Sequence, residues 1–316
     1  MAGKFFLKLF LIGLVLSACT PRVQQIPETG FPEGELGSIL RAGILVISTD
    51  PDYPPQSKLI EGEKRAPGTL CEANQYTANQ FEGFDIDVAI EIAARLDVEP
   101  CFVTPTWGQI VGGGWADHWN VNVGSMAITM NRMDKLYFTQ PYTTGEAVLF
   151  VHEDNTTING PEDLSGKRVG VCAGCAYEEY IMGTLKIPGF DVEYRLNDAI
   201  PVGYDTDTSA LLDLSLGDGD RLDAVMTDPD TGFAAIQTGL ELKQLDEIIY
   251  RDFVAVSVDK RSSSDPVPLV VKLTEIIQAM HADGTLSRLS EKYYNFDHTQ
   301  AAADYDIYEL GQLSEP

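Results

Sequence analysis

The residues best suited to binding chemistry gather in one stretch, 124–142, which reads GSMAITMNRMDKLYFTQPY. It begins with the small residues Gly124, Ser125 and Ala127, and small side chains let a ligand approach backbone N–H groups. Arg132 follows five residues after Ala127, and its planar guanidinium suits a carboxylate. The stretch therefore predicts a loop that holds the carboxylate of a small molecule. The alternative is a buried strand followed by a surface helix, with Arg132 in an ordinary surface ion pair.

The composition limits the class of protein. A chain of 316 residues allows about two domains, and a hydrophobic content of 44% is typical of a globular protein. The net charge of −26 argues against a nucleic-acid partner, because neutralising phosphates needs a basic surface. The sequence has no phosphate-binding loop or nucleophile elbow, and its four histidines lack metal-ligand spacing. We therefore expect no cofactor and no metal.

The first residues are predicted to be an export signal. Two lysines precede an apolar run at 9–16 that is too short to span a bilayer. The sequence Leu-Ser-Ala-Cys follows and resembles the bacterial lipobox, in which the cysteine is acylated and becomes the mature N-terminus. This predicts a signal peptide over 1–18, lipidation at Cys19 and a membrane contact through the lipid alone. An ordinary secretory signal with a nearby cleavage site is the alternative.

Four cysteines remain after Cys19, and four can form two disulfides. Cys172 and Cys175 are close enough to pair, which leaves Cys71 to pair with Cys101. A zinc site built from two such pairs would need a second Cys-x-x-Cys, which 71 and 101 do not provide. A thioredoxin-like redox motif is the rival interpretation of Cys172 and Cys175, since they also follow a strand and open a helix. The rest of the chain gives that motif no thioredoxin-like context.

Short apolar runs alternate with amphipathic segments, which indicates β-α-β units and a parallel sheet with right-handed crossovers. Strands are expected at 44–48, 100–104, 121–123, 148–151, 168–171, 192–195, 222–227 and 253–258. Helices are expected at 85–96, 177–185, 209–216, from 229 onward, 267–280 and 285–294. Residues 57–81 are expected to form an irregular insertion held through Cys71.

Several short motifs occur in a recognisable order along the chain. They are Thr49-Asp50-x-x-Tyr53-x-Pro55, Gly83-Phe84-Asp85-Ile86-Asp87, Trp107, Ile128-Thr129-x-x-Arg132, Phe138-x-x-Pro141-Tyr142, Asp163-Leu164-x-Gly166-Lys167-x-Val169-Gly170-Val171-x-Ala173-Gly174, Asp223-Ala224-Val225-x-Thr227-Asp228 and Ala282-Asp283-Gly284-Thr285. In this order they resemble a family 3 extracellular solute-binding protein, the polar-amino-acid receptor of a bacterial ABC importer. The resemblance covers about residues 41–295.

The resemblance implies an α/β fold of the two-lobed, type II periplasmic-binding-protein kind. Each lobe would be a mostly parallel sheet flanked by helices, and two crossing strands would join the lobes. Lobe 1 would take 41–145 plus 255–300, and lobe 2 would take 146–254. A flexible spacer at 19–40 would precede them, and an acidic, loosely packed tail at 301–316 would follow. The ligand would lie in the cleft between the lobes, with hinge closure as the expected motion.

The resemblance also implies roles for the ligand-binding residues. Arg132 would hold the carboxylate, helped by backbone N–H groups near Gly124, Ser125 and Ala127 and at the helix start at Cys175 and Ala176. Asp228 would bind the ammonium group, Asp50 would serve as a second acid for the side chain, and Tyr53 and Trp107 would stack on the ligand. Asp228 also reads as a helix N-cap, Asp50 as a turn residue, and the two aromatics as core residues.

Two departures from the family pattern affect these roles. The family usually has Ser or Thr where this chain has Cys175 and Ala176, and it often has a hydroxyl residue at the position of Ala127. Only backbone donors carry over at these positions. A Cys172–Cys175 disulfide would then stiffen the loop in place of the hydroxyl contacts.

The function implied is that of a non-catalytic, monomeric receptor, exported and lipid-anchored, that passes a free amino acid to an ABC permease. One alternative is a periplasmic dehydratase of the cyclohexadienyl or prephenate type, because the same fold hosts such enzymes. Another alternative is a ligand-sensing module. Arg132 and Asp228 together favour a zwitterionic ligand, whereas a dicarboxylate would need a second cation in place of Asp228.

Overall fold

The computed structural model describes residues 30–314. The chain divides into two units, residues 1–31 and residues 32–316, and every helix and strand named below belongs to the second. The predicted signal peptide and Cys19 lie outside the described residues. Among the helices that the structure describes, none combines the length and the apolar character needed to cross a membrane.

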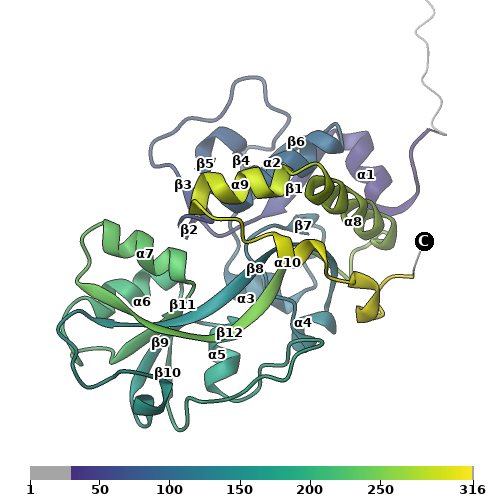
Figure 1. Cartoon of the computed structure of the whole chain (residues 1–316). Coiled ribbons are helices and arrows are strands. Elements are labelled where there is room, and N and C mark those ends of the chain that lie inside the picture. Colours follow the sequence, from purple (N-terminus) through teal and green to yellow (C-terminus); the bar gives the residue numbers. More distant parts are fainter. Residues whose placement is uncertain (1–29, 315–316) are drawn as a thin grey trace, which may run out of the picture. The chain divides into compact units, whose positions relative to one another are not determined.

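A nine-stranded mixed sheet forms the centre of the second unit, in the order β10-β9-β11-β8-β12-β7-β1-β6-β4. The strands β1, β6 and β7 are parallel to one another, and so are β9, β10 and β11. Between these groups the long strands β8 and β12 pair antiparallel and link the two ends of the sheet (Figure 1). The bounds are β1 (Ile44–Ser48), β4 (Tyr76–Thr77), β6 (Glu99–Val103), β7 (Val121–Asn122), β8 (Leu136–His152), β9 (Arg168–Cys172), β10 (Ile200–Tyr204), β11 (Ala224–Thr227) and β12 (Leu242–Asp259).

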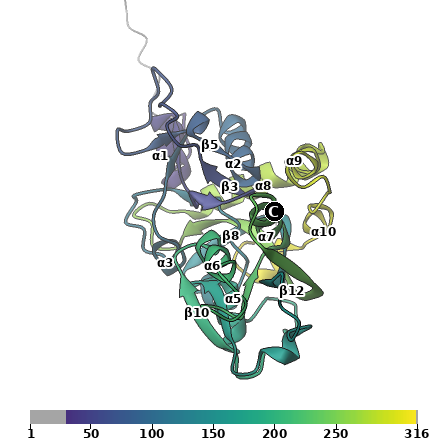
Figure 2. The same cartoon turned by 90° about the vertical axis from the view of Figure 1, so that its left-hand side faces the viewer.

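We call the part with β7, β1, β6 and β4 the first half-sheet and the part with β10, β9 and β11 the second half-sheet. The first half-sheet is covered by α1 (Gly34–Ala42), α2 (Phe84–Arg95), α8 (Val267–Ala282) and α9 (Thr285–Tyr294). The second is covered by α5 (Ala176–Ile181), α6 (Asp207–Leu214) and α7 (Pro229–Gln237), as Figures 1 and 2 show. A small separate sheet joins β2 (Asp52–Tyr53), β3 (Ser57–Leu59) and β5 (Phe81–Glu82). The remaining elements are α3 (Trp107–Gly112), α4 (Met130–Met133), α10 (Gln300–Ala303), η1 (Ala78–Gln80), η2 (Pro161–Leu164) and η3 (Ile307–Leu310).

The buried apolar side chains follow the same division. One cluster packs α2 against β1 and β6 and includes Val88, Ile92 and Leu96, the face that their spacing predicts. Another cluster packs α5 against β9 and includes Val169 and Tyr180. The predicted α/β fold with a mostly parallel sheet is therefore confirmed, while the predicted lobe limits stay a prediction.

The sequence prediction was wrong about one strand of the second half-sheet. Residues 192–195 are not a strand, and β10 lies at Ile200–Tyr204 instead. This strand contains Pro201 and Gly203 and is only partly buried, because it forms an edge of the sheet. Proline is tolerated on edge strands, where one side of the backbone needs no partner. Apolar alternation, the signal used for the other strands, is therefore weak there.

Both ends of the domain are more ordered than the sequence predicts. Residues 34–40, assigned to a flexible spacer, are part of α1, which buries Leu36 and Ile39 against the first half-sheet. The acidic tail, expected to pack loosely, lies along β8. There Gln140 Nε2 donates to the carbonyls of Ala302 and Tyr305 at 2.7 and 2.9 Å. The tail also buries Ala302 and Ile307. The two corrections therefore share a cause, because a few buried apolar residues can anchor a segment of polar composition.

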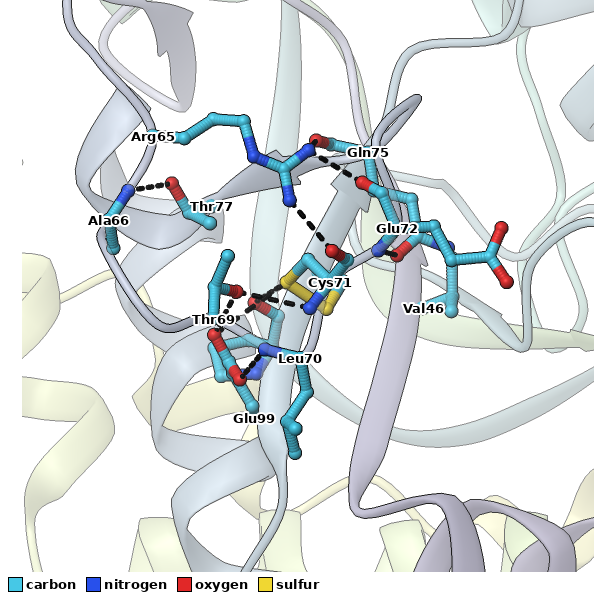
Figure 3. Close-up of a disulfide and its surroundings, with 12 residues drawn as sticks. Val46, Arg65, Ala66, Thr69, Leu70, Cys71, Glu72, Gln75, Thr77 and Glu99 are labelled. Atoms are coloured by element: carbon cyan, nitrogen blue, oxygen red, sulfur yellow. Dashed lines mark hydrogen bonds between the residues drawn. A yellow bond between two sulfur atoms is a disulfide. The ribbon is translucent and has the colours of Figure 1, made fainter.

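The insertion at 57–81 is joined to the first half-sheet by a disulfide and is stabilised internally by hydrogen bonds (Figure 3). A disulfide joins Cys71 to Cys101 on β6. The guanidinium of Arg65 donates to the carbonyl oxygens of Cys71, Glu72 and Gln75 at 2.7, 2.6 and 2.8 Å. The insertion also contributes β3, β4 and η1, so it is more regular than expected.

Candidate functional site

A cleft lies between the two half-sheets, and residues from both sides line it. Every residue that the sequence predicts to touch a ligand is in its lining. These residues are Asp50, Tyr53, Trp107, Gly124, Ser125, Ala127, Arg132, Cys175, Ala176 and Asp228. The cleft is therefore the place where their chemistry has to be examined together.

Arg132 is a buried cation without a carboxylate partner. Its side chain lies on the short helix α4 and the residue is only 3% exposed. Nη1 donates to the carbonyl of Ala127 at 2.9 Å and Nη2 donates to the carbonyl of Gly174 at 3.3 Å. Among the described residues Arg132 forms no ion pair, and its Nε has no hydrogen-bond partner. This rules out the alternative of an ordinary surface ion pair.

The Trp107 ring covers the guanidinium, with 5.4 Å between Arg132 Cζ and the ring centroid. Burial lowers the pKa of Arg132, but the usual value is far enough above neutrality that the group stays charged. The guanidinium has five N–H donors, and two of them are accounted for by backbone carbonyls. A buried charge with unused donors is costly unless an anion compensates it. The remaining donors can take a carboxylate.

The buried acid Asp85 fixes the loop that begins at Gly124. Asp85, near the start of α2, accepts from Ser125 Oγ and from the Tyr142 hydroxyl, both at 2.8 Å. Burial raises the pKa of Asp85 to about 7. The Ser125 backbone N–H donates to the Tyr142 hydroxyl at 3.1 Å, so in this structure it is engaged within the protein.

Ala127 keeps its predicted backbone donor. It forms an isolated bridge with Val254, but the two bonds of this bridge come from the N–H groups of Ile128 and Ala255. The N–H of Ala127 takes no part in them. It remains a donor that a ligand in the cleft can use.

The loop of the Cys172–Cys175 disulfide forms the facing wall. Its Gly174 has a positive φ of 78°, which suits glycine, and its carbonyl accepts from Trp107 Nε1 at 3.2 Å as well as from Arg132. The N–H of Cys175 donates to the carbonyl of Cys172, so it is not free for a ligand. Ala176 is the first residue of α5, and its N–H has no partner within the helix.

Asp228 combines two roles on the same wall. Its Oδ1 caps α7 by accepting from the Asp230 N–H at 2.9 Å, which is the N-cap alternative. The same oxygen accepts from Gln56 Nε2 at 3.0 Å, while Thr231 Oγ1 donates to Gln56 Oε1 at 3.1 Å. Burial and the nearby Asp230 raise the pKa of Asp228 well above its ordinary value. Gln56 thus bridges the two walls of the cleft.

The predicted aromatic and acidic side-chain contacts are partly used within the protein. The hydroxyls of Tyr53 and Tyr177 lie 3.3 Å apart across the cleft. Trp107 stacks on Arg132, where the sequence predicted stacking on the ligand. Asp50 Oδ1 accepts from the Asp52 N–H at 2.7 Å, as a turn residue would, and burial raises its pKa. Asp50 nevertheless lines the cleft as well.

Sequence reasoning missed further acids in the lining, and for a reason. Asp205 and Asp207 follow β10, the strand that the sequence did not reveal, and the C-terminal ends of parallel strands are where ligands bind in α/β sheets. Asp252 lies within β12 and its pKa is raised to about 6 by burial, which the charge of Arg132 opposes. The full lining brings together seven carboxylates: Asp50, Glu146, Asp205, Asp207, Asp228, Asp230 and Asp252.

Three comparisons relate this arrangement to known proteins. A sequence model of the bacterial extracellular solute-binding proteins, family 3, matches residues 45–296. The L-cystine-binding protein TcyJ of Escherichia coli strain K12 is 27% identical over 270 residues, which are 85% of this chain and 89% of that protein. The histidine-binding periplasmic protein of the same strain is 26% identical over 303 residues, which are 93% of this chain and 98% of that protein.

A solved structure shows the same fold. The crystal structure of the ancestral amino acid-binding protein AncCDT-1, a precursor of cyclohexadienyl dehydratase, superposes with a TM-score of 0.65. It is 26% identical, and the match covers 82% of this chain and 99% of that chain. The similarity therefore extends over both half-sheets and the cleft between them.

Proposed function

The chain belongs to the bacterial extracellular solute-binding proteins of family 3, and from this we propose that it captures a free amino acid and delivers it to the permease of an ABC importer. The relatives that support this proposal bind L-cystine and histidine, and the solved structure is that of an ancestral amino acid-binding protein. The protein works outside the cytoplasm, as a periplasmic relative does.

The observation that carries the proposal is the buried, unpaired guanidinium of Arg132. Its free donors face a cleft whose opposite wall holds Asp228. An amino acid supplies both missing charges, because its carboxylate pairs with Arg132 and its ammonium group pairs with Asp228. The N–H groups of Ala127 and Ala176 add neutral donors on either side of the carboxylate.

The hydrogen bonds that span the cleft support capture by closure. The Gln56 side chain donates a hydrogen bond to Asp228, and the Trp107 ring donates one to the Gly174 carbonyl. The hydroxyls of Tyr53 and Tyr177 are also hydrogen-bonded to each other. Each contact joins a residue before 145 to one after it, as closure of predicted lobe 1 on predicted lobe 2 requires. Ligand capture would then be coupled to a hinge in the long strands β8 and β12.

A dehydratase is the second candidate, because AncCDT-1 is a precursor of cyclohexadienyl dehydratase. A cyclic dicarboxylic acid would want two cations in the cleft. The lining offers one guanidinium and seven carboxylates, which favours a zwitterion or a cation. We therefore propose a binding protein without catalytic activity, and we prefer transport to a sensing role.

The remaining parts of the proposal come from the sequence. A signal peptide over 1–18 and acylation of Cys19 would anchor the protein by lipid to the outer side of the cytoplasmic membrane. The receptor would act as a monomer.

Thermal-shift screening against the twenty amino acids and prephenate tests the proposal. Ligand-free protein should show a raised unfolding temperature with at least one amino acid, because a ligand that binds only the folded state stabilises it. An absence of any shift with amino acids, or turnover of prephenate, would show that the proposed function is wrong.

A further inference from the structure

The disulfide between Cys172 and Cys175 lies in the wall of the cleft, and the proposed function makes no use of its chemistry. Both of these cysteines line the cleft. The other disulfide, between Cys71 and Cys101, belongs to the insertion and lies outside the lining. A thiolate that reaches a disulfide sulfur attacks it and forms a mixed disulfide. A ligand that carries a thiol would therefore meet a reactive partner in this wall.

A buried acid lies beside the two sulfurs. Asp207 is the first residue of α6, is 5% exposed and lines the cleft as well. One of its carboxylate oxygens and the sulfurs of Cys172 and Cys175 lie within 4.8 Å of one another. Among the described residues its Oδ1 has no hydrogen-bond partner. A buried polar atom without a partner is rare in folded proteins, so this oxygen is available to a proton donor in the cleft.

The environment of Asp207 suits it to exchange a proton with a thiol. Burial raises the pKa of Asp207 to about 7, and the charge of Asp50 adds to this. An ordinary cysteine thiol has a pKa of about 8.5, and an ordinary aspartate has one near 4. Proton transfer is most efficient when the acceptor's pKa is close to the working pH. Asp207 can thus take the proton of a thiol and also return it.

The disulfide is next to the place where the ligand's carboxylate would be held. Gly174 lies between the two cysteines in the sequence, and its carbonyl accepts from Arg132 at 3.3 Å. Ala176, whose N–H is one of the proposed carboxylate donors, directly follows Cys175. Consecutive Cα atoms are about 3.8 Å apart. A ligand bound there by its carboxylate therefore needs only a short side chain to bring its last atom to the disulfide.

We propose that the Cys172–Cys175 disulfide captures a thiol-bearing amino acid covalently and reversibly by thiol–disulfide exchange. This inference rests on the proposed function and adds a reaction and a substrate class to it. Asp207 takes the proton of the ligand thiol, and the thiolate attacks one sulfur of the disulfide. A bond forms between the ligand sulfur and that cysteine, the bond between the two cysteines breaks, and the released cysteine sulfur takes the proton from Asp207.

The exchange needs no further oxidant, because the ligand sulfur is oxidised while the released cysteine sulfur is reduced. The reverse step frees the ligand. The released cysteine attacks the mixed disulfide, the bond between Cys172 and Cys175 forms again, and the ligand leaves as a thiol. The two cysteines are three positions apart in the sequence, so the released thiol stays close to the mixed disulfide.

Anaerobic incubation of the oxidised protein with L-cysteine, followed by acid quenching, alkylation and peptide mass mapping, tests the proposal. Cys172–Cys175 should open to a mixed disulfide at least about tenfold faster than with 2-mercaptoethanol at equal thiolate concentration, because a docked thiol has a high effective concentration. The Cys71–Cys101 disulfide is the internal control, since its cysteines are also buried but lie outside the cleft. It should show no preference for L-cysteine.

Asp207→Asn tests the proton transfer. At pH 7 this variant should react with L-cysteine at least about tenfold more slowly than the wild-type protein, because it lacks the proton acceptor. At about pH 9.5 the ligand thiol ionises without help, so the two rates should agree within about threefold. Asp213→Asn is the matched control, since Asp213 lies on the same helix and its carboxylate binds Tyr204 and Arg221. It should react like the wild-type protein at both pH values.

Equal opening rates with the two thiols, in a protein that binds an amino acid, would overturn the covalent capture and leave the proposed function intact. An Asp207→Asn variant that is as fast as the wild-type protein at pH 7, or equally slowed at both pH values, would overturn the proton transfer by Asp207. Binding of no amino acid would overturn the proposed function, and the docked exchange with it.

Discussion

Arg132 shows which part of the site the sequence could reveal. The small residues before it and its fork of donors predict a carboxylate site from residue type and spacing. Its burial, its bonds to the carbonyls of Ala127 and Gly174 and its stacking against Trp107 depend on residues distant in the sequence. Spacing along the chain carries no information about them. The same holds for Asp85, which suits the positive end of α2 but in fact fixes Ser125 and Tyr142.

Trp107 should act as a positioning residue for Arg132. Trp107→Phe keeps a ring near the guanidinium but loses the Nε1 bond to the Gly174 carbonyl. One net hydrogen bond is worth about 1 kcal/mol, so amino-acid affinity should fall about fivefold in calorimetric titrations.

Trp119→Phe provides the control, because Trp119 is buried and its Nε1 has no partner among the described residues. It should leave the affinity unchanged. Equal losses in the two variants would mean that Trp107 has a general packing role and does not position Arg132.

At the scale of elements, the two disulfides should have different consequences. The Cys71–Cys101 bond closes a loop with a sequence separation of 30 and lies in the insertion, whereas Cys172–Cys175 closes three residues in the cleft wall. Loop-closure entropy predicts that Cys71→Ser/Cys101→Ser lowers the free energy of unfolding by about 2–4 kcal/mol. Amino-acid affinity should hardly change in that variant.

Cys172→Ser/Cys175→Ser should give the opposite pattern. The Cys172–Cys175 disulfide closes a short loop, so its entropic contribution to stability is smaller. The same loop holds the Gly174 carbonyl against Arg132 and Trp107. We expect the affinity to fall about three- to tenfold, with a smaller change in stability than in the other variant. Denaturant unfolding and calorimetry on both variants measure the contrast, and unchanged affinity in the cleft variant would contradict it.

Most elements could be predicted, because their apolar periodicity is strong. The strand β1 and the helix α9 have the predicted bounds, and the buried face of α2 is the predicted one. The missed strand β10 has a proline, a glycine and partial exposure, so its alternation is weak. Because β10 was not predicted, Asp205 and Asp207, which follow it, were not predicted to line the cleft either. Ligand sites in α/β sheets lie at the C-terminal ends of the strands, so a missed strand hides the residues at its end.

At the scale of the whole molecule, the buried acids in and beside the cleft should make stability depend on pH. Asp85 and Asp207 have pKa values raised to about 7 and Asp252 to about 6, against an ordinary value near 4. Such acids bind protons more tightly in the folded state, so the stability they contribute is lost as pH rises through this range.

The ligand-free protein should therefore unfold more easily at pH 8 than at pH 5. We expect the free energy of unfolding to fall by at least about 1.4 kcal/mol, the value of a one-unit pKa difference for one group. Urea unfolding at constant high salt measures it, and salt screens the surface repulsion of a chain with net charge −26. Asp207→Asn should flatten the dependence, and a stability that rises with pH would contradict the account.

Arg132 is central to this account, because its guanidinium contacts the Ala127 carbonyl on one wall of the cleft and the Gly174 carbonyl on the other. Calorimetric titration of Arg132→Ala and Arg132→Lys with the amino acid that binds the wild-type protein most tightly tests this most directly. The alanine variant should lose at least about a hundredfold in affinity, or about 2.7 kcal/mol, while its unfolding transition stays cooperative. The affinity of the lysine variant should lie between those of the wild-type protein and the alanine variant, since lysine keeps the positive charge but lacks the planar set of donors. A folded alanine variant that binds within threefold of the wild-type protein would contradict the assignment of Arg132 as the carboxylate site.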